Sequence, residues 1–326
     1  MKICVLGSGA WGTALAKLLC ENGHDVVIWG NEPDVLAAIG ETHANERYLP
    51  GIQLPESLRL GADLPSSVAG CEIVVFAVPS AAIRPVAEQL PDFNAIAVSV
   101  AKGIEYETGL TNCGILREAL GTEKVAALSG PSLALEVAKG VPGAIVAAST
   151  DEAVVKIVQD AFHRPTFRVY GSTDLTGVEL GGALKNVIAI AAGAGDGLGF
   201  GDNSKAALIT RAIAEIRRLG VACGAQAETF SGLSGIGDLT VTCFSKLSRN
   251  RTFGEKFGAG GKASELLENA VHVVEGVPAA KSAHELARKH GVDTPIIDEV
   301  YAMLHEGKPL KQAIADLIGR EAKVEE

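Results

Sequence analysis

Lysines stand at two places in the chain where they could act on a substrate. Lys102 follows an apolar run and is flanked by small residues, so it could donate to an anionic or carbonyl group or simply be a solvated surface charge. Lys185 lies four and three residues after Gly181 and Gly182. On a helix these glycines would leave the surface beneath the lysine bare of side chains. Either a packed helix or a ligand, such as a nicotinamide ring or a small substrate oriented by Asn186, could come close there.

A run of polar side chains follows in the second half of the chain, where residues 248–251 read Ser-Arg-Asn-Arg. Arginine is suited to bidentate recognition of phosphate, and its hydroxyl and amide neighbours add neutral donors. The residues alone favour an exposed polar loop, and phosphate binding is the alternative. Two acids lie nearby in sequence, Asp238 after a Gly-Ile-Gly segment and Glu275 after two valines. The second could close over a cofactor or only end a helix.

A glycine-rich turn is the strongest local signal in the chain. Residues 7–12 read Gly-Ser-Gly-Ala-Trp-Gly, directly after a predicted strand over 3–6 and at the start of a predicted helix over 11–21. In this pattern Gly7 makes the tight turn, Gly9 lets the backbone approach a pyrophosphate, and Gly12 allows the helix to pack closely on the strand. The sequence therefore predicts a dinucleotide-binding site.

The end of the second predicted strand bears on the choice of cofactor. An acid at this place can bind the ribose 2′-hydroxyl, whereas a base accommodates a 2′-phosphate. The chain has Asn31 and Glu32 here, followed by Pro33. Glu32 could bind the ribose or only favour the N-terminus of the next helix. The sequence leaves open the preference between NADH and NADPH.

These residues must be held by elements that the apolar pattern predicts. Short apolar runs alternate with helical segments up to about residue 172, which indicates a doubly wound, Rossmann-type α/β domain. The predicted strands cover 3–6, 26–29, 73–78, 95–100, 125–129, 144–148 and 167–170. Lys102 and the loop at 129–132 follow two of them, at the edge where open parallel sheets bind ligands.

Beyond residue 172 helical patterns take over, and we expect an all-helical C-terminal domain. The predicted helices cover 175–194, 205–219, 264–269, 279–290, 294–304 and 310–317. We therefore divide the chain into a dinucleotide-binding domain over 1–172 and a helical substrate-binding and catalytic domain over 173–326. The default place for a ligand is a cleft at their seam.

Composition excludes several other classes of protein. The net charge is −10 and aromatic residues make up 5% of the chain, so it lacks the basic footprint and the stacking platforms of a nucleic-acid binder. The six cysteines form no C-x-x-C pair, and no metal site is supported. No secretory signal is visible, and no uncharged apolar stretch approaches the roughly 20 residues of a membrane-spanning helix. We expect a cytoplasmic protein without membrane insertion.

Taken together, these motifs closely resemble those of the bacterial NAD(P)-dependent glycerol-3-phosphate dehydrogenases. The resemblance runs in order through nearly the whole chain and rests on residues 7–15, 78–80, 101–103, 129–132, 181–186, 237–239, 248–251 and 273–276. It implies reversible reduction of dihydroxyacetone phosphate to sn-glycerol 3-phosphate by NAD(P)H, a step that supplies glycerophospholipid synthesis. A homodimer is expected on the same ground.

The resemblance also implies roles for individual residues. Lys185 would be the catalytic general acid/base, and Asn186 beside it is expected to bind the substrate. The other residues implied to contact the substrate are Lys102, Gly130, Ser132, Asp238, Ser248, Arg249 and Asn250. The residues implied to line the cofactor are Gly7, Gly9, Ala10, Trp11, Gly12, Asn31, Lys102, Ala134, Arg249, Val273 and Glu275. Asn31 departs from the basic residue or histidine often found at this place in the family, which argues against a strong preference for NADPH.

Two alternatives are kept beside this hypothesis. A related two-domain reductase of another small keto substrate would share the nucleotide site and a helical lysine, but it would not need the polar run at 248–251. A catalytically silent cofactor-sensing module would not need both Lys185 and Asp238.

Overall fold

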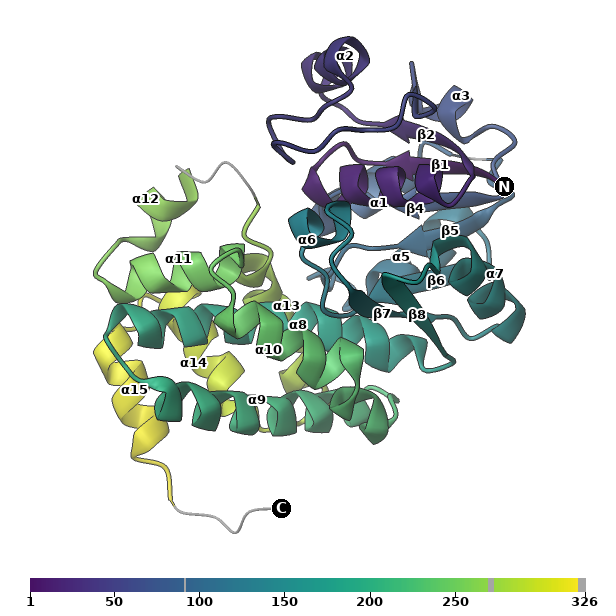
Figure 1. Ribbon diagram of the computed structural model, residues 1–326. Helices are drawn as coiled ribbons and strands as arrows, with labels where there is room; N and C mark the ends of the chain where they lie inside the picture. The colour runs from purple at the N-terminus through teal and green to yellow at the C-terminus, as the bar shows by residue number, and fades with distance from the viewer. Residues whose placement is uncertain (91, 269–272, 322–326) are drawn as a thin grey trace.

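The strands of the computed structural model, which describes residues 1–90, 92–268 and 273–321, form a single sheet. The sheet has eight strands in the order β3-β2-β1-β4-β5-β6-β7-β8 (Figure 1). Their bounds are β1 Lys2–Leu6, β2 Asp25–Trp29, β3 Arg59–Leu60, β4 Ile73–Phe76, β5 Ile96–Ser99, β6 Val125–Ser129, β7 Gly143–Ala148 and β8 Phe167–Ser172. Every strand that the sequence predicts is confirmed. The two-residue edge strand β3 was not predicted, because both of its residues are exposed and no apolar run marks it.

The sequence pattern indicates a parallel sheet, but the observed sheet is not parallel throughout. β1 to β6 run parallel, but β7 pairs antiparallel with β6, so that β7 and β8 run against the other strands. The chain from β6 to β7 contains one short helix, α6 (Ala134–Ala138), and it does not run back along the strand, as a parallel return would require. Instead the chain turns back at the carboxyl end of β6, and Ser129 pairs with Val146, the fourth residue of β7.

Helices cover both faces of the sheet, because alternate residues of its strands are buried under different layers. Ile3 and Val5 of β1 pack with α1 (Ala10–Glu21) and α7 (Glu152–Phe162). Cys4 and Leu6 face the other way, toward α3, α4 and α5. Those helices cover Leu64–Val68, Ile83–Ala87 and Asn112–Leu120. α2 (Pro33–Thr42) follows β2 near the edge of the sheet (Figure 1). This is the doubly wound arrangement that the sequence predicts, with strands buried on both sides.

The second half of the chain is built around one central helix, α8 (Leu175–Gly197). Around it lie the 3₁₀ turn η2 (Ala227–Ser231) and the π-helical turn η3 (Leu233–Gly237). The α-helices of this half are α9 Asp202–Ala222, α10 Asp238–Phe244, α11 Arg249–Gly258, α12 Ala263–Glu268, α13 Gly276–His290, α14 Pro295–His305 and α15 Leu310–Ile318. Every helix predicted here from the sequence is confirmed, although Asn269 lies outside the described residues. α10 and α11 were not predicted. Both bear directly on the site described below.

α8 is long and apolar enough to cross a membrane by length and composition alone, but the rest of the protein covers it. In its most apolar window, 89% of the helix is buried inside the molecule. Its apolar side chains therefore form the core of the helical lobe, which lies beside the sheet lobe in Figure 1.

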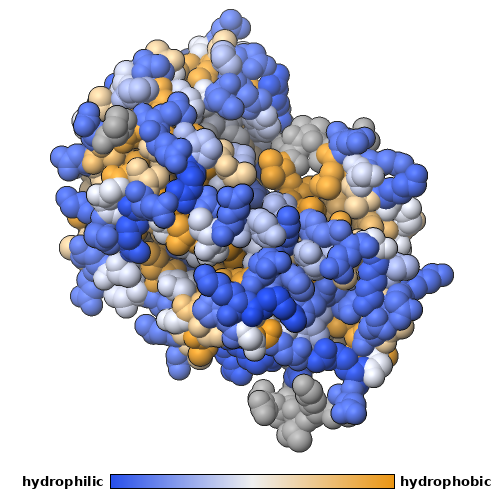
Figure 2. Space-filling model, turned by 180° about the vertical axis from the view of Figure 1, so that it is seen from behind, coloured by the Kyte–Doolittle hydropathy of each residue, from blue (hydrophilic) through white to orange (hydrophobic). Residues whose placement is uncertain are grey.

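The two lobes meet along α8, which contacts both. Its first turns, at Leu175 and Val178, share a core cluster with the sheet, and later residues from Leu180 onward belong to the helical core. β8 ends at Ser172 and α8 begins at Leu175. The division of the chain between residues 172 and 173 stays a prediction, since the first turn of α8 packs in a core cluster of the sheet. Seen from behind, most of the surface is hydrophilic, and hydrophobic residues gather near the notch between the lobes (Figure 2).

Candidate active site

The glycine-rich turn after β1 has the shape of a phosphate cradle. Gly7 has a φ of +121°, and a Cβ there would lie 2.7 Å from the carbonyl carbon of Ala77. A Cβ on Gly12 would lie 2.0 Å from the carbonyl oxygen of Gly7. Gly9 precedes the first turn of α1, and nothing lies within 4 Å of where its Cβ would be. The open space faces the N-terminus of a helix, where an anion is stabilised. These residues fit a dinucleotide pyrophosphate.

The other residues expected around the cofactor lie on separate elements. Ala10 and Trp11 open α1, and Ala134 opens α6, where all three pack partly buried against the same core. Asn31 follows the end of β2 and is exposed. Glu32 makes no capping hydrogen bond to α2, although it precedes that helix. Both of its carboxylate oxygens accept from the hydroxyl of Tyr48 at 2.9 Å.

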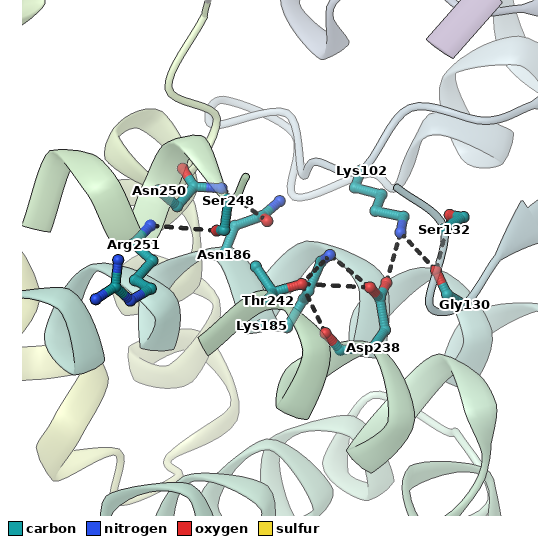
Figure 3. Close-up of polar contacts among 10 residues, drawn as sticks. All are labelled: Lys102, Gly130, Ser132, Lys185, Asn186, Asp238, Thr242, Ser248, Asn250 and Arg251. Atoms are coloured by element: carbon teal, nitrogen blue, oxygen red, sulfur yellow. Dashed lines mark hydrogen bonds and ion pairs between the residues drawn. The ribbon is translucent and has the colours of Figure 1, made fainter. Parts of the chain in front are cut away.

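Lys185 lies at the centre of the site and is buried with its partners. Its Nζ donates to Oδ1 of Asp238 at 2.6 Å and to Oγ1 of Thr242 at 2.7 Å (Figure 3). α8 carries the lysine, and α10 carries both partners one turn apart. The hydroxyl of Thr242 in turn donates to the carbonyl oxygen of Asp238 at 2.6 Å. Lys185 is 7% exposed and Asp238 is 1% exposed, so water screens this pair little.

The surroundings of Lys185 tune its acidity. Burial lowers the pKa of its ammonium to about 8, while the attraction of Asp238 acts in the opposite direction and the nearby charge of Lys102 lowers the pKa further. A lysine with such a pKa exchanges its proton close to neutral pH. That is the property required of a general acid and base.

Lys102 reaches the same carboxylate from the other lobe. Its Nζ donates to Oδ2 of Asp238 and to the carbonyl oxygen of Gly130 at 3.1 Å. Ser132 donates its hydroxyl to that carbonyl at 2.9 Å. Gly130 has a φ of +144°, and a Cβ there would lie 3.1 Å from the Cα of Ile145. The structure thus brings Lys102, Gly130 and Ser132 from the sheet lobe to Asp238 and Lys185 of the helical lobe (Figure 3).

The two glycines before Lys185 make room for other parts of the protein and not for the ligand considered above. A Cβ on Gly181 would lie 2.5 Å from the carbonyl oxygen of Ser234. A Cβ on Gly182 would lie 2.6 Å from Oγ of Ser129 and 3.4 Å from the side chain of Lys102. Protein atoms therefore occupy the space that the glycines open. Because Gly181 and Gly182 have no side chains, α8 can approach both η3 and the end of β6.

Residues 248–251 form a helix start and not the exposed loop that their polarity suggested. Ser248 precedes the first turn of α11, and its Oγ accepts from the backbone N–H of Arg251 at 3.2 Å. Arg251 is buried and forms an ion pair with Asp196 at 2.6 Å. Arg249 is exposed, and it makes no hydrogen bond or ion pair with any residue that the structure describes. One arginine therefore anchors the turn, and the other is available to an anion.

A chain of amides joins this turn to the neighbourhood of Lys185. Nδ2 of Asn250 donates to Oδ1 of Asn186 at 2.9 Å, and Oδ1 of Asn250 accepts from the backbone N–H of Gly276 at 2.9 Å. Asn186 and Asn250 are both buried. The first turn of α11 is thereby fixed relative to α8 and to the start of α13.

Glu275 and Val273 lie where the helical lobe approaches the sheet. A carboxylate oxygen of Glu275 accepts from the backbone N–H of Ser80 at 3.2 Å. Burial raises the pKa of this carboxyl, and Arg249 and the Ser80 hydrogen bond act in the opposite direction. Val273 is 48% exposed. Glu275 thus forms a direct contact between the lobes.

Sequence reasoning missed Thr242, which contacts the lysine as closely as Asp238 does. The available signal was its spacing: residues four apart on a helix share a face, and Asp238 and Thr242 are four apart. That signal needs α10, which was not predicted. Among the described residues, the structure contains no group of three or more His, Cys, Asp or Glu side chains that could hold a metal ion.

Comparisons with known proteins agree in one family. Two family models match, those of the NAD-dependent glycerol-3-phosphate dehydrogenase N-terminus over residues 2–155 and C-terminus over residues 174–315. A glycerol-3-phosphate dehydrogenase [NAD(P)+] of Geobacter sp. strain M21 is 49% identical, covering 99% of this chain and 98% of its own. A protein of the same name from Moorella thermoacetica is also 49% identical, covering 98% and 96%.

Solved structures lead to the same group. Glycerol-3-phosphate dehydrogenase from Coxiella burnetii superposes with a TM-score of 0.93 at 38% identity, covering 98% of this chain and 99% of its own. The yeast glycerol-3-phosphate dehydrogenase gives a TM-score of 0.83 at 31% identity, with the same coverage. A ketopantoate reductase from Ralstonia eutropha, at 17% identity and a TM-score of 0.62, shares the fold alone.

Proposed function

Because this chain belongs to the NAD-dependent glycerol-3-phosphate dehydrogenase family, we propose that it interconverts dihydroxyacetone phosphate and sn-glycerol 3-phosphate with NAD(P)H. It is an oxidoreductase. The observation that carries the assignment to residues is the buried Lys185, held between Asp238 and Thr242 beside the seam of the lobes. The proposal for individual site residues rests on this geometry and on the sequence motifs.

The proton chemistry follows from the position of Lys185. When bound, NAD(P)H would supply the hydride that the carbonyl carbon of the substrate accepts. Negative charge then develops on the carbonyl oxygen, and the Lys185 ammonium stabilises it and transfers its proton to it. The product is a secondary alcohol, and Lys185 is left neutral. In the oxidation direction neutral Lys185 takes the hydroxyl proton.

Asp238 and Lys102 keep Lys185 oriented and set the local charge. Asp238 binds one lysine with each carboxylate oxygen, so the two ammonium groups are held apart by a shared partner. The three groups carry one net positive charge. A phosphorylated substrate is therefore attracted to the site even though the whole chain carries a net charge of −10. Gly130 and Ser132 fix the position of Lys102.

The first turn of α11 binds the substrate phosphate in this proposal. Arg249 offers there a guanidinium that forms no hydrogen bond or ion pair with the described residues, and the helix N-terminus adds a favourable field. Asn250 and Asn186 contribute amide groups beside it, with the Ser248 cap holding the turn in shape. Binding energy from the phosphate, which does not react, then positions the carbonyl next to Lys185.

Two variants test these roles. In Lys185→Met we expect turnover to fall by about 10² to 10⁴, as for the loss of a positioned acid, with NADH binding retained. In Arg249→Ala we expect KM for dihydroxyacetone phosphate to rise about tenfold or more, because a hydrogen-bonded charge contact is lost. Rates with unphosphorylated dihydroxyacetone should change little. Lys246→Ala, which removes an exposed charge from the segment before α11, is the matched control.

Each result has a clear contrary outcome. Near-normal oxidation of NADH by Lys185→Met would remove the lysine from the catalytic role. An unchanged KM in Arg249→Ala would remove the arginine from the phosphate site. Turnover of unphosphorylated keto acids in preference to dihydroxyacetone phosphate would support the related-reductase alternative, and tight cofactor binding without any turnover would support the sensing module.

We also propose that the protein is a cytoplasmic homodimer. This proposal rests on the resemblance of its motifs to the bacterial enzymes. Size-exclusion chromatography with light scattering distinguishes a dimer from a monomer. A mass of 33.6 kDa in solution would contradict the dimer.

A further inference from the structure

The carboxyl end of β2 carries a group of charged residues that the reaction itself does not use. In sheets of this kind the adenosine ribose lies just beyond this strand, so the groups here meet either a 2′-hydroxyl or a 2′-phosphate. The inference that follows rests on the dinucleotide site proposed above and concerns which of the two cofactors it takes. We define the adenosine rim as Asn31, Glu32, Asp34, Arg47 and Tyr48.

Arg47 is the residue of the rim that could bind a 2′-phosphate, but acids already engage it. Its Nη1 lies 3.3 Å from Oε1 of Glu32, and its Nη2 lies 2.6 Å from Oδ2 of Asp34. Each terminal nitrogen of the guanidinium thus contacts a different carboxylate. The hydrogen bond from Arg47 also holds the pKa of Asp34 below its usual value, so Asp34 is ionised at neutral pH. Both terminal nitrogens of Arg47 are therefore engaged by carboxylates.

The rim is fixed close to the phosphate cradle. Asn45 is buried, and its Nδ2 donates to the carbonyl oxygen of Ser8 and to Oγ1 of Thr13, both at 2.8 Å. The backbone N–H of Tyr48 donates to Oδ1 of Asn45 at 3.2 Å. Since Ser8 belongs to the glycine-rich turn, the segment bearing Arg47 is tethered to the pyrophosphate site. Tyr48 then holds Glu32 with its hydroxyl.

The charge balance of the rim opposes a phosphate. One positive group, Arg47, stands against two negative ones, Glu32 and Asp34, and Asn31 is neutral. A phosphate monoester carries about −1.5 to −2 at pH 7, so it would meet net repulsion. A ribose hydroxyl is neutral and can donate to a carboxylate. Exposed ion pairs are individually weak, so the preference comes from this balance of charge and not from an immovable Arg47.

We propose that Glu32 and Asp34, by neutralising Arg47, make this chain prefer NADH to NADPH. The specificity-determining unit is therefore the pair of acids on either side of Pro33. Asn31 contributes by supplying no positive charge of its own.

Direct binding tests this without any turnover. Trp11 opens α1 beside the cradle and Trp29 ends β2, so quenching of tryptophan fluorescence can report the Kd of each reduced cofactor. We expect wild-type protein to bind NADH about tenfold more tightly than NADPH. In Glu32→Gln combined with Asp34→Asn, NADPH should bind about tenfold more tightly than to wild type, because the fork of Arg47 is released.

Three further variants make the result decisive. Glu41→Gln combined with Glu56→Gln removes two exposed acids away from Arg47 and should leave the ratio of the two Kd values unchanged. Adding Arg47→Gln to the double variant should abolish its gain for NADPH. Arg47→Gln alone should weaken NADPH binding only about twofold to threefold, because Glu32 and Asp34 already offset the charge of Arg47. Thermal unfolding of each variant verifies that the protein is folded.

The proposal is overturned if wild-type protein binds NADPH as tightly as NADH. It is also overturned if Arg47→Gln alone weakens NADPH binding tenfold, which would mean that Arg47 leaves the acids to hold the 2′-phosphate. These outcomes leave the proposed function standing. Failure of that function has a separate sign, namely tight binding of a reduced cofactor with no turnover of dihydroxyacetone phosphate.

Discussion

A single carboxylate between two lysines governs the chemistry at the scale of residues. Asp238 is almost wholly buried, and it binds Lys185 and Lys102 with its separate oxygens. Without it two ammonium groups would face each other in a poorly solvated place, which is unfavourable. The pair of lysines can therefore exist only because this acid lies between them.

The lowered pKa of Lys185 predicts opposite pH profiles for the two directions of the reaction. Ketone reduction needs the protonated lysine, so kcat/KM for dihydroxyacetone phosphate should fall as the pH rises through about 8. Alcohol oxidation needs the neutral lysine, so kcat/KM for sn-glycerol 3-phosphate should rise through the same pH. Initial rates between pH 6 and 10, with NADH binding measured as a control, provide the check. Profiles that rise in both directions would argue against Lys185 as the proton donor.

Thr242 predicts a shift of that midpoint. Its hydroxyl accepts from the Lys185 ammonium at 2.7 Å. Thr242→Val keeps the shape and removes the acceptor, which disfavours the charged lysine and should lower the kinetic pKa by about one unit. Thr240→Val, at an exposed position of the same helix, should leave the midpoint in place. An unchanged midpoint in Thr242→Val would limit the threonine to packing.

At the scale of elements, α8 and α11 are in unusually close contact through glycines. A Cβ on Gly254 of α11 would lie 2.1 Å from the carbonyl oxygen of Ile190, and one on Gly193 of α8 would lie 2.0 Å from that of Arg251. Gly258 and Gly197 repeat the pattern one turn further. Backbone therefore meets backbone, and the distance between Lys185 on one helix and Arg249 on the other is set by residues without side chains.

Gly254→Ala tests this spacing. The added methyl group must push the helices apart, and we expect a loss of about 1–3 kcal/mol in the free energy of unfolding. The displaced α11 should also raise KM for dihydroxyacetone phosphate, with a smaller change in the Kd of NADH. Gly143→Ala, at a glycine with nothing within 4 Å of the new Cβ, is the control. Denaturant unfolding and steady-state kinetics measure both effects, and wild-type values for both would contradict the role of the contact.

At the scale of the whole molecule, buried polar contacts tie the lobes together across the site. Glu179 of α8 accepts from the backbone N–H of Cys113 at 2.8 Å and from Oγ1 of Thr111 at 2.7 Å, at the start of α5. Glu275 and Ser80 form a second contact, and Lys102 with Asp238 a third. The residues that bind substrate in our proposal come from both lobes, so these contacts determine the geometry of the site.

Glu179→Ala should loosen the lobes. The N–H of Cys113 would lose its partner in a buried place, at a cost of about 1–3 kcal/mol. Both tryptophans lie in the sheet lobe, so fluorescence follows that lobe alone, whereas far-UV circular dichroism follows both. We expect the two unfolding midpoints to coincide in wild-type protein and to separate in the variant. Glu179→Gln, which keeps an acceptor, should behave like wild type, and coincident midpoints in Glu179→Ala would show that this contact does not couple the lobes.

The sequence by itself determined the parts of this protein that depend on neighbouring residues. Every predicted strand is present, and the turn at Gly7, Gly9 and Gly12 has the geometry that its pattern predicts. These features follow from local rules: apolar runs must be buried, and only glycine tolerates the φ and the close approach required at the turn. The family could be inferred for the same reason, because its motifs are short and continuous.

Only the tertiary structure decided how distant segments meet. Lys185 contacts Asp238 and Thr242 at separations of 53 and 57 residues, and no local pattern fixes which side chain fills such a place. The same holds for the glycines before Lys185, which let η3 and the end of β6 approach α8 closely. It also holds for the direction of β7, which depends on how the chain returns from β6. Arg47 shows it most clearly. Its type suggests an anion site, but two acids that converge on it in the fold decide what that site can bind.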